Sequence, residues 1–255
     1  MSKMLADVSD IDLLVDKQNG ASAMRTWADK IIAFNAALEF THPLPKGIGV
    51  MNPFHENQGA LEASSAFYRR YYSDNESRYL ILGINPGRFG AGLTGVPFTD
   101  PKRLREYCGI TSYEGPSAHE PSSAFVYAMI KQYGGAEKFY AKFYISSICP
   151  LGFTVRKENG KEVNCNYYDS IDLTNSARAF MLECLTKQLD FGLRREVCFC
   201  LGTGKNEKFI TALNREHGFF GKVIALEHPR YIMQYKAKRI QEYIDKYIRS
   251  FNEQP

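Results

Sequence analysis

The chain has 255 residues, of which 44% are hydrophobic and 24% are charged, and its net charge is +4. This composition is typical of an ordinary soluble globular protein, and no apolar run approaches the length of a membrane span. Residues 1–20 are acidic and interrupted, unlike a signal peptide. We therefore expect no membrane partner and a location in the cytoplasm, at the nucleoid if the source is bacterial, or in the nucleus.

Helical and extended segments alternate along the chain. Residues 1–20 are expected to be loosely ordered, and residues 21–255 to form a single domain. Apolar residues at helical spacing predict helices at 21–40, 62–72, 101–108, 124–133 (capped by Ser122 or Ser123), 172–191, 206–216 and 233–251. Short apolar runs predict buried strands that end near Leu82, Cys149, Leu201 and Leu226. This alternation predicts an α/β fold, a three-layer α/β/α sandwich around a central four-stranded parallel sheet.

The two segments that remain are polar or rich in turns. Residues 49–54 form a short extended piece, and residues 157–168 are expected to be a surface loop or a hairpin. None of the six cysteines forms a Cys-x-x-Cys pair, which argues against a zinc site or a redox couple. We expect reduced, structural thiols and no metal.

A glycine-rich loop after the first strand is the most distinctive stretch. Glycine recurs there at positions 83, 87, 90, 92 and 95, which lets the backbone turn sharply and approach a ligand closely. Ligands of open α/β sheets bind just outside the carboxyl ends of the strands. Because the loop also holds Asn85 and Phe98, we predict a pocket at this place.

The known nucleotide-binding patterns do not fit. A phosphate-binding loop needs Gly-x4-Gly-Lys-Ser/Thr, and no lysine follows these glycines. Gly90-Ala-Gly-Leu-Thr-Gly95 has the spacing of the dinucleotide fingerprint Gly-x-Gly-x-x-Gly, but it does not directly follow the predicted strand that ends near Leu82. Gly202-Thr-Gly-Lys205 lacks both the leading glycine and the trailing hydroxyl. Nucleoside triphosphate chemistry is therefore disfavoured.

Three strand ends carry side chains that can take part in binding or catalysis. A parallel sheet brings such strand ends to one edge. They are Asn85 and Phe98, then Ser146 and Ser147, and finally His228.

Two motifs at these strand ends resemble those of the uracil-DNA glycosylase superfamily, most closely its single-strand-selective monofunctional uracil-DNA glycosylases. Gly83-Ile-Asn-Pro-Gly-Arg-Phe-Gly90 and Thr94-Gly-Val-Pro-Phe98 match the family's Gly-Met-Asn-Pro-Gly-Pro-Phe-Gly and Thr-Gly-Val-Pro-Phe at the same spacing. His228-Pro229 matches the start of its second motif. Weaker matches, at Val50-Met-Asn-Pro53, Cys149-Pro-Leu151 and Gly202-Thr-Gly-Lys205, extend the resemblance over roughly residues 35–248.

The resemblance implies a monofunctional enzyme of base excision repair. It would flip uracil out of single- or double-stranded DNA and hydrolyse the N-glycosidic bond, leaving an abasic site. With a broader substrate range, it would also excise related damaged bases. Asn85 would position the water, and His228 would donate a hydrogen bond to uracil O2 as charge develops there. Phe98 would stack on the base, with Ile84, Gly87 and Ser147 also against it. No cofactor is implied, and we expect a monomer.

This sequence departs from the family at three places. Ser147 replaces the family's base-reading asparagine, which leaves the range of excised bases open. Arg88 replaces a proline, and it would either meet a phosphate or limit the pocket. Arg230 and Tyr231, with Met233, stand where the family has its inserted wedge. Basic residues beyond them would contact phosphates; they are Lys236, Lys238 and Arg239.

An alternative function is a non-catalytic module on the same fold that captures damaged or single-stranded DNA. The joint presence of Asn85, Phe98 and His228 favours the enzyme, since a binding module has little need of all three. Plainer structural roles also stay open for some residues. Ser147 could serve strand packing alone, and the basic run from Lys236 to Arg239 could be only the wet face of a helix.

Overall fold

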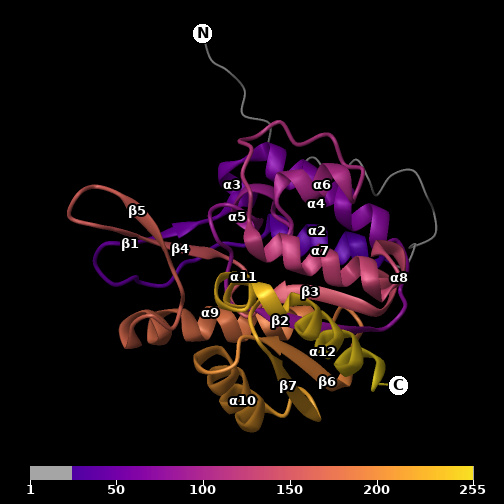
Figure 1. The fold of residues 1–255 in the computed structure, drawn as a ribbon. Coiled ribbons are helices and arrows are strands. Elements are labelled where there is room, and N and C mark those ends of the chain that lie inside the picture. The colour runs from indigo at the N-terminus through magenta and orange to yellow at the C-terminus, as the bar shows by residue number, and fades with distance from the viewer. Residues whose placement is uncertain (1–24, 255) are drawn as a thin grey trace, which may run out of the picture.

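Four parallel strands form the centre of the molecule. The computed structural model describes residues 25–254, so the N-terminal segment 1–20 lies outside the described residues. The strand order is β3–β2–β6–β7 (Figure 1). The strands are β2 (Arg78–Gly83), β3 (Phe143–Ser147), β6 (Leu193–Leu201) and β7 (Lys222–Leu226). The four-stranded parallel sheet predicted from the sequence is confirmed.

Helices connect these strands and cover both faces of the sheet. Their bounds are α2 (Trp27–Ala36), α3 (Pro53–Glu56), α4 (Gln58–Tyr71), α5 (Ala91–Thr94), α6 (Pro101–Glu106), α7 (Pro121–Tyr133), α8 (Ala136–Lys142), α9 (Ile171–Leu189), α10 (Lys205–His217), α11 (Pro229–Tyr235), the 3-10 helix η1 (Ala237–Arg239) and α12 (Ile240–Asn252). In the described part of the chain, none of them has the length and apolar character that a bilayer crossing requires.

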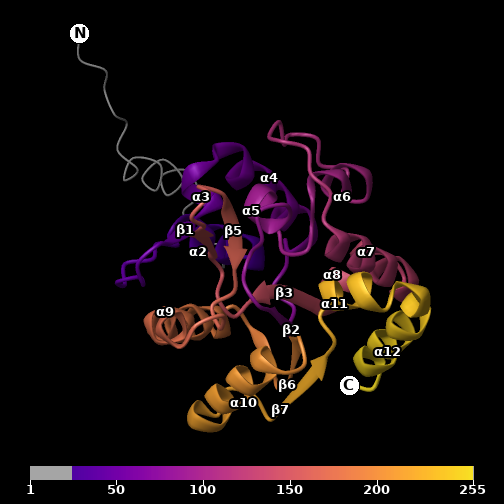
Figure 2. The ribbon, with the colours of Figure 1, turned by 60° about the vertical axis from the view of Figure 1, so that its left-hand side comes forward.

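Two adjacent aromatic residues of β3 pack against helices on opposite faces of the sheet. Phe143 packs against Phe251 of α12, with ring centroids 4.7 Å apart. Tyr144 packs edge-on against Trp27 of α2 at 5.5 Å. Successive residues of a strand point to opposite faces, so these contacts belong to different layers. Figure 2 shows α7 and α12 on one side of the sheet and α9 and α10 on the other. The predicted three-layer sandwich is therefore also confirmed.

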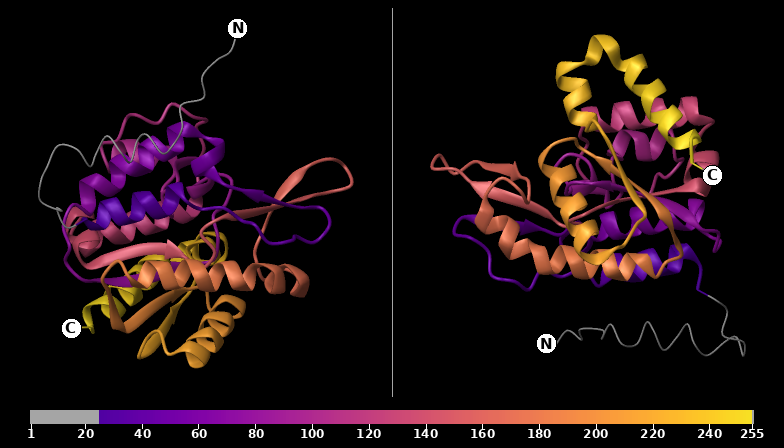
Figure 3. Two further views of the ribbon diagram at one scale, coloured as in Figure 1. Left: turned by 180° about the vertical axis from the view of Figure 1, so that it is seen from behind. Right: turned by 90° about the horizontal axis from the view of Figure 1, so that it is seen from below.

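A second, antiparallel sheet was not predicted. Its strands lie in the order β1–β4–β5, with β1 at Ile48–Met51, β4 at Gly152–Arg156 and β5 at Glu162–Cys165. The β4–β5 hairpin projects from the body of the molecule together with β1 (Figure 3). The sequence indicated an extended piece and a loop or hairpin at these positions. It could not indicate their pairing, because β1 and β4 are distant in the chain and both are short.

The predicted helix 233–251 differs from the structure. The chain forms α11 from Pro229 to Tyr235, then η1, and only then α12. Lys236, with φ −129° and ψ 18°, has left the helical region. Both α11 and α12 pack against α7, so the break redirects the chain between two positions on one neighbour. No glycine or proline marks the break, which is why the periodicity concealed it.

The predicted serine cap of α7 is also wrong. Glu120 occupies the cap position, without a capping bond from its own side chain, and Pro121 begins the helix. Ser123 Oγ instead donates to Glu120 Oε2 at 3.0 Å and accepts from the backbone N–H of Asp100 at 3.1 Å. The serine therefore ties the starts of α6 and α7 together. The short helix α8 was not predicted.

Candidate active site

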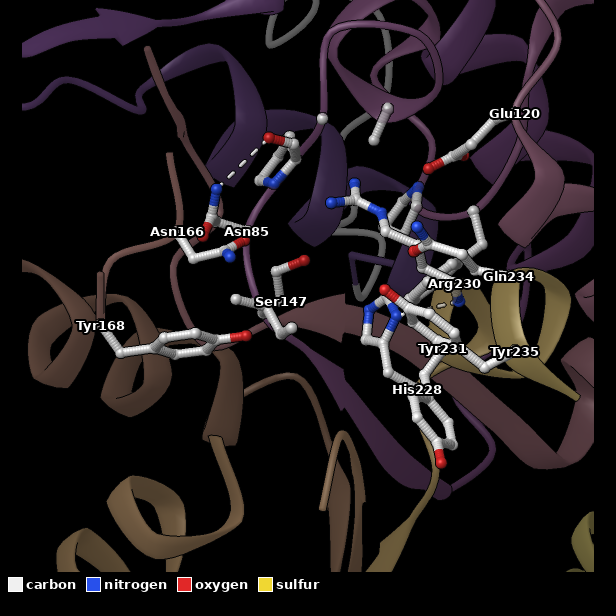
Figure 4. Close-up of a pocket in the computed structure, with 16 residues that line it drawn as sticks. Asn85, Glu120, Ser147, Asn166, Tyr168, His228, Arg230, Tyr231, Gln234 and Tyr235 are labelled. Carbon is white, nitrogen blue, oxygen red and sulfur yellow. Dashed lines mark hydrogen bonds between the residues drawn. The ribbon is translucent and has the colours of Figure 1, made fainter. Parts of the chain in front are cut away.

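A cavity of about 210 Å³ opens at the carboxyl ends of β2, β3 and β7 (Figure 4). The structure brings most of the predicted site residues to its walls, namely Ile84, Asn85, Gly87, Phe98, Ser147, His228, Arg230 and Tyr231. The other predicted DNA-contacting residues, Arg88, Met233, Lys236 and Arg239, do not line it. Sequence positions far apart thus share one chamber, as the convergence of parallel strand ends requires.

Five further residues with polar side chains, which the sequence did not single out, also line the cavity. They are Glu120, Asn166, Tyr168, Gln234 and Tyr235. The sequence did contain a signal for Gln234 and Tyr235, because residues three and four positions after Tyr231 lie on the same side of a helix. Glu120, Asn166 and Tyr168 lie in loops, where periodicity gives no guidance.

Gly83 makes room for two walls of the cavity. It ends β2 and is paired in register with Ser147, the last residue of β3. A Cβ atom at Gly83 would lie 3.2 Å from the Phe98 ring and 3.4 Å from Ser147 Oγ. A side chain at this position would press on the Phe98 ring, so the glycine lets the ring lie close against the strand end.

Phe98 is held in a strained backbone conformation. Its φ of 52° is left-handed, which costs a non-glycine residue about 1–3 kcal/mol. The buried Thr94 supports the turn, since its Oγ1 donates to Thr99 O at 2.6 Å and accepts from Val96 N at 3.2 Å. The Phe98 ring lies 5.6 Å from that of His228, so the two sequence motifs meet directly.

Asn85 has its side-chain amide fixed by the last residue of β5 and by the turn that follows it. Its Nδ2 donates to Cys165 O at 3.1 Å and, more weakly, to Pro86 O at 3.4 Å. Its Oδ1 accepts from the backbone N–H of Tyr167 at 3.2 Å. Among the residues that the structure describes, these bonds use both N–H groups and one lone pair of Oδ1. A second lone pair of Oδ1 stays available to the cavity.

His228 is fixed as a neutral donor. It caps α11, and its Nδ1 accepts a hydrogen bond from the backbone N–H of Arg230 at 3.1 Å. Since Nδ1 is an acceptor, the ring proton resides on Nε2. Although part of the imidazole faces the cavity, the protein around it disfavours the cation. Burial, and secondarily the charge of Arg230, lowers the pKa of His228 from 6.5 to about 3.

Glu120 brings a carboxyl group to the same cavity. Burial raises its pKa, while the hydrogen bond from Ser123 and the charge of Arg230 oppose that shift. Gly90 leaves the space that this carboxyl fills, because a Cβ atom there would collide with Oε2. Arg230 lies across the entrance, with one guanidinium nitrogen 3.4 Å from where a Cβ of Gly87 would be. The cavity is therefore lined by one acidic and one basic side chain, and the charge of Arg230 acts on Glu120.

No cluster of three or more His, Cys, Asp or Glu side chains able to hold a metal ion occurs within residues 25–254. All six cysteines are free and buried. Near the strand ends, the cavity offers an amide acceptor, a neutral imidazole donor, an aromatic face and a hydroxyl. Such a set can position water and stabilise an anion that forms in the cavity.

The chain is similar to known proteins of one family. The model of the uracil DNA glycosylase superfamily matches residues 70–252. The single-strand selective monofunctional uracil-DNA glycosylase of Rattus norvegicus is 28% identical over 139 aligned residues, and the match covers 48% of each chain. That of Bos taurus is 26% identical over 100 aligned residues, and the match covers 33% of this chain and 37% of the bovine one. The matches thus span about half or less of the length of these relatives.

A solved structure is more similar. The crystal structure of wild-type SMUG2 from Pedobacter heparinus is 57% identical, with a TM-score of 0.88, and the match covers 90% of this chain and 98% of that one. Family model, related sequences and related structure agree. The chain belongs to the uracil DNA glycosylase superfamily.

Proposed function

We propose that this protein is a monofunctional uracil-DNA glycosylase, which flips uracil into the cavity, hydrolyses its N-glycosidic bond and leaves an abasic site in DNA. The observation that carries the proposal is the convergence of Asn85, Phe98 and His228 in one cavity. We also propose that it acts as a monomer, in the compartment that holds the DNA. The names of the related proteins support uracil in DNA as the substrate.

Asn85 has the hydrogen-bonding capacity to aim a water molecule. Both of its N–H groups are engaged by backbone carbonyls, so it meets the cavity as an acceptor. A water that donates to the remaining lone pair of Oδ1 directs its own lone pair away from the amide. With the anomeric carbon of a flipped nucleotide on that side, the water is placed for attack.

His228 supplies the complementary part of the reaction. Cleavage leaves the bonding electron pair on the departing base, and negative charge develops on uracil O2. A neutral imidazole with its proton on Nε2 donates to that oxygen without carrying a charge that burial would penalise. The fixed tautomer means that the donor is ready before the substrate arrives.

Phe98 and Ser147 would hold the base itself. Stacking on an aromatic ring contributes about 1–3 kcal/mol per base, which helps to offset extrusion of the nucleotide from DNA. Ser147 presents a hydroxyl at the end of β3, shorter than the amide of the family. The range of excised bases depends on how this hydroxyl meets the edge of the base.

The DNA-contacting surface is proposed to centre on α11. Tyr231 and Tyr235 are 43% and 65% exposed, and their rings lie 5.4 Å apart at the mouth of the cavity. Lys236 lies over the Tyr231 ring. Met233 packs partly buried against the core, and Arg239 is paired with Glu242, so both have structural partners in the free protein. The wedge is therefore assigned to the tyrosines.

Release of free base is the test of the function. Single- and double-stranded oligonucleotides carrying one uracil, hypoxanthine, xanthine or hydroxymethyluracil are incubated with the protein, and abasic sites are measured. Release of uracil is expected. Release of further bases would indicate that Ser147, in place of the family's asparagine, widens the pocket for the base. DNA binding without release of any base would instead support the non-catalytic module.

The tyrosine pair can be tested separately. Tyr235→Ala is expected to weaken binding of single-stranded DNA about tenfold, or ~1.4 kcal/mol, because a stacking surface is lost. The rate at saturating enzyme should change little, since Tyr235 is placed at the rim. Tyr107→Ala is the matched control, because Tyr107 is 50% exposed but does not line the cavity. Equal weakening in both variants would argue against a specific stacking surface.

A further inference from the structure

The amide of Asn85 is held by a segment that belongs to the other sheet. We propose that residues 164–167, where β5 ends and the following turn begins, are a clamp that orients Asn85, with Asn164, Tyr167 and Asn206 as positioning residues. The inference rests on the proposed function, because it concerns the residue that would aim the water.

The clamp touches Asn85 through backbone groups on either side of Asn166. Cys165 O accepts from Nδ2 at 3.1 Å, and Tyr167 N–H donates to Oδ1 at 3.2 Å. A terminal amide torsion is otherwise broad and roughly two-fold. These two bonds choose one of its orientations and set the direction of the remaining Oδ1 lone pair. A shift of this segment would therefore turn the amide even with every cavity side chain in place.

Asn164 anchors the front of the clamp to the loop that carries Asn85. Its Oδ1 accepts from both the backbone N–H and the Nε of Arg88, each at 3.2 Å. Its Nδ2 lies 3.3 Å from where a Cβ of Gly87 would be, so a side chain at Gly87 would force the Asn164 amide to shift slightly. Arg88 is accordingly turned toward the hairpin in the free protein. This gives Arg88 a structural partner besides any phosphate.

Tyr167 and Asn206 anchor the rear of the clamp to the central sheet. Tyr167 is fully buried, and its hydroxyl donates to Asn206 Oδ1 at 2.8 Å. Asn206, also buried, donates through Nδ2 to Leu201 O at 3.0 Å, at the end of β6. β6 is the neighbour of β2, which leads to Asn85. The β5 end of the projecting β4–β5 hairpin (Figure 3) is thereby tied both to the loop that carries Asn85 and to the central sheet.

Single-turnover kinetics with enzyme in excess test the clamp on the intact protein. Asn164→Ala and Tyr167→Phe are each expected to slow uracil release by about 10- to 100-fold with little change in DNA affinity, because small misplacements of a positioning group are costly. Asn164→Asp, which keeps the Oδ1 acceptor, should recover most of the rate. The matched controls are Asn214→Ala and Tyr72→Phe, whose side chains bond to Phe220 and Phe143 O away from the cavity and should leave the rate unchanged.

A double-mutant comparison separates positioning from general damage. If Tyr167→Phe acts through Asn85, adding it to Asn85→Ala should cause no further loss of rate. The same loss factor in both backgrounds would overturn the clamp, as would unchanged rates in the single variants of an active protein. A wild-type protein that releases no base would contradict the proposed function and the clamp with it. The clamp is refuted separately from the proposed function only if the wild-type protein releases uracil and the variants behave as described above.

Discussion

Replacing His228 with alanine is expected to slow uracil release by about 100- to 1000-fold, which corresponds to ~3–4 kcal/mol of lost stabilisation in the transition state. The substitution removes the Nε2–H donor, which is the group that faces the base because Nδ1 already accepts a hydrogen bond from the backbone N–H of Arg230. Charge on uracil O2 develops only as the bond breaks, so DNA affinity should change little. The measurement is the single-turnover rate on a single-stranded uracil oligonucleotide, with DNA affinity followed in parallel.

The low pKa of His228 supplies an independent control. With a value of about 3, the imidazole stays neutral through the physiological range. Between about pH 4 and 8, nitrogen NMR of His228 should therefore show one neutral tautomer and no titration near 6.5. A rate that rises as His228 takes up a proton near pH 6 would contradict the assigned role. The same pKa difference affects folding stability. Acidification below about pH 6.5 lowers the free energy of unfolding, because His228 binds a proton more readily in the unfolded chain.

The central sheet could be predicted because each strand is a short apolar run bounded by turn signals, and the edge of that sheet located the cavity. Asn85, Phe98 and His228 each follow a predicted strand end or lie in the loop beyond it. Once a parallel sheet was inferred, their convergence followed from topology.

The remaining parts of the site depend on contacts that periodicity does not encode. Glu120 reaches the cavity because Gly90, distant in sequence, leaves space for its carboxyl. The clamp on Asn85 is made by backbone groups of Cys165 and Tyr167, and backbone groups leave no mark in a pattern of side chains. The break between α11 and α12 is similarly set by packing on α7. Long-range contacts of this kind require coordinates.

In the proposed reaction, the two motifs would act on opposite sides of the bond that breaks. The first motif would supply Asn85 at the sugar side, and the second would supply His228 at the departing base. The contact between the rings of Phe98 and His228, 5.6 Å between centroids, joins them. Because Phe98 is strained, the turn around Thr94 must be stable enough to hold the ring in place before the base arrives.

Asn85→Ala is expected to slow uracil release by about 100- to 10,000-fold, the range typical for loss of a group that prepares the reacting water. The substitution removes the Oδ1 lone pair that faces the cavity and also frees Cys165 O and Tyr167 N–H, which can then bind water. DNA affinity should be retained, because Phe98 and the tyrosines of α11 are untouched. The measurement is again a single-turnover rate, with melting temperature as the control for folding. A variant that folds, binds DNA and cleaves at the wild-type rate would remove Asn85 from the mechanism, and would leave the water to be positioned by another cavity residue.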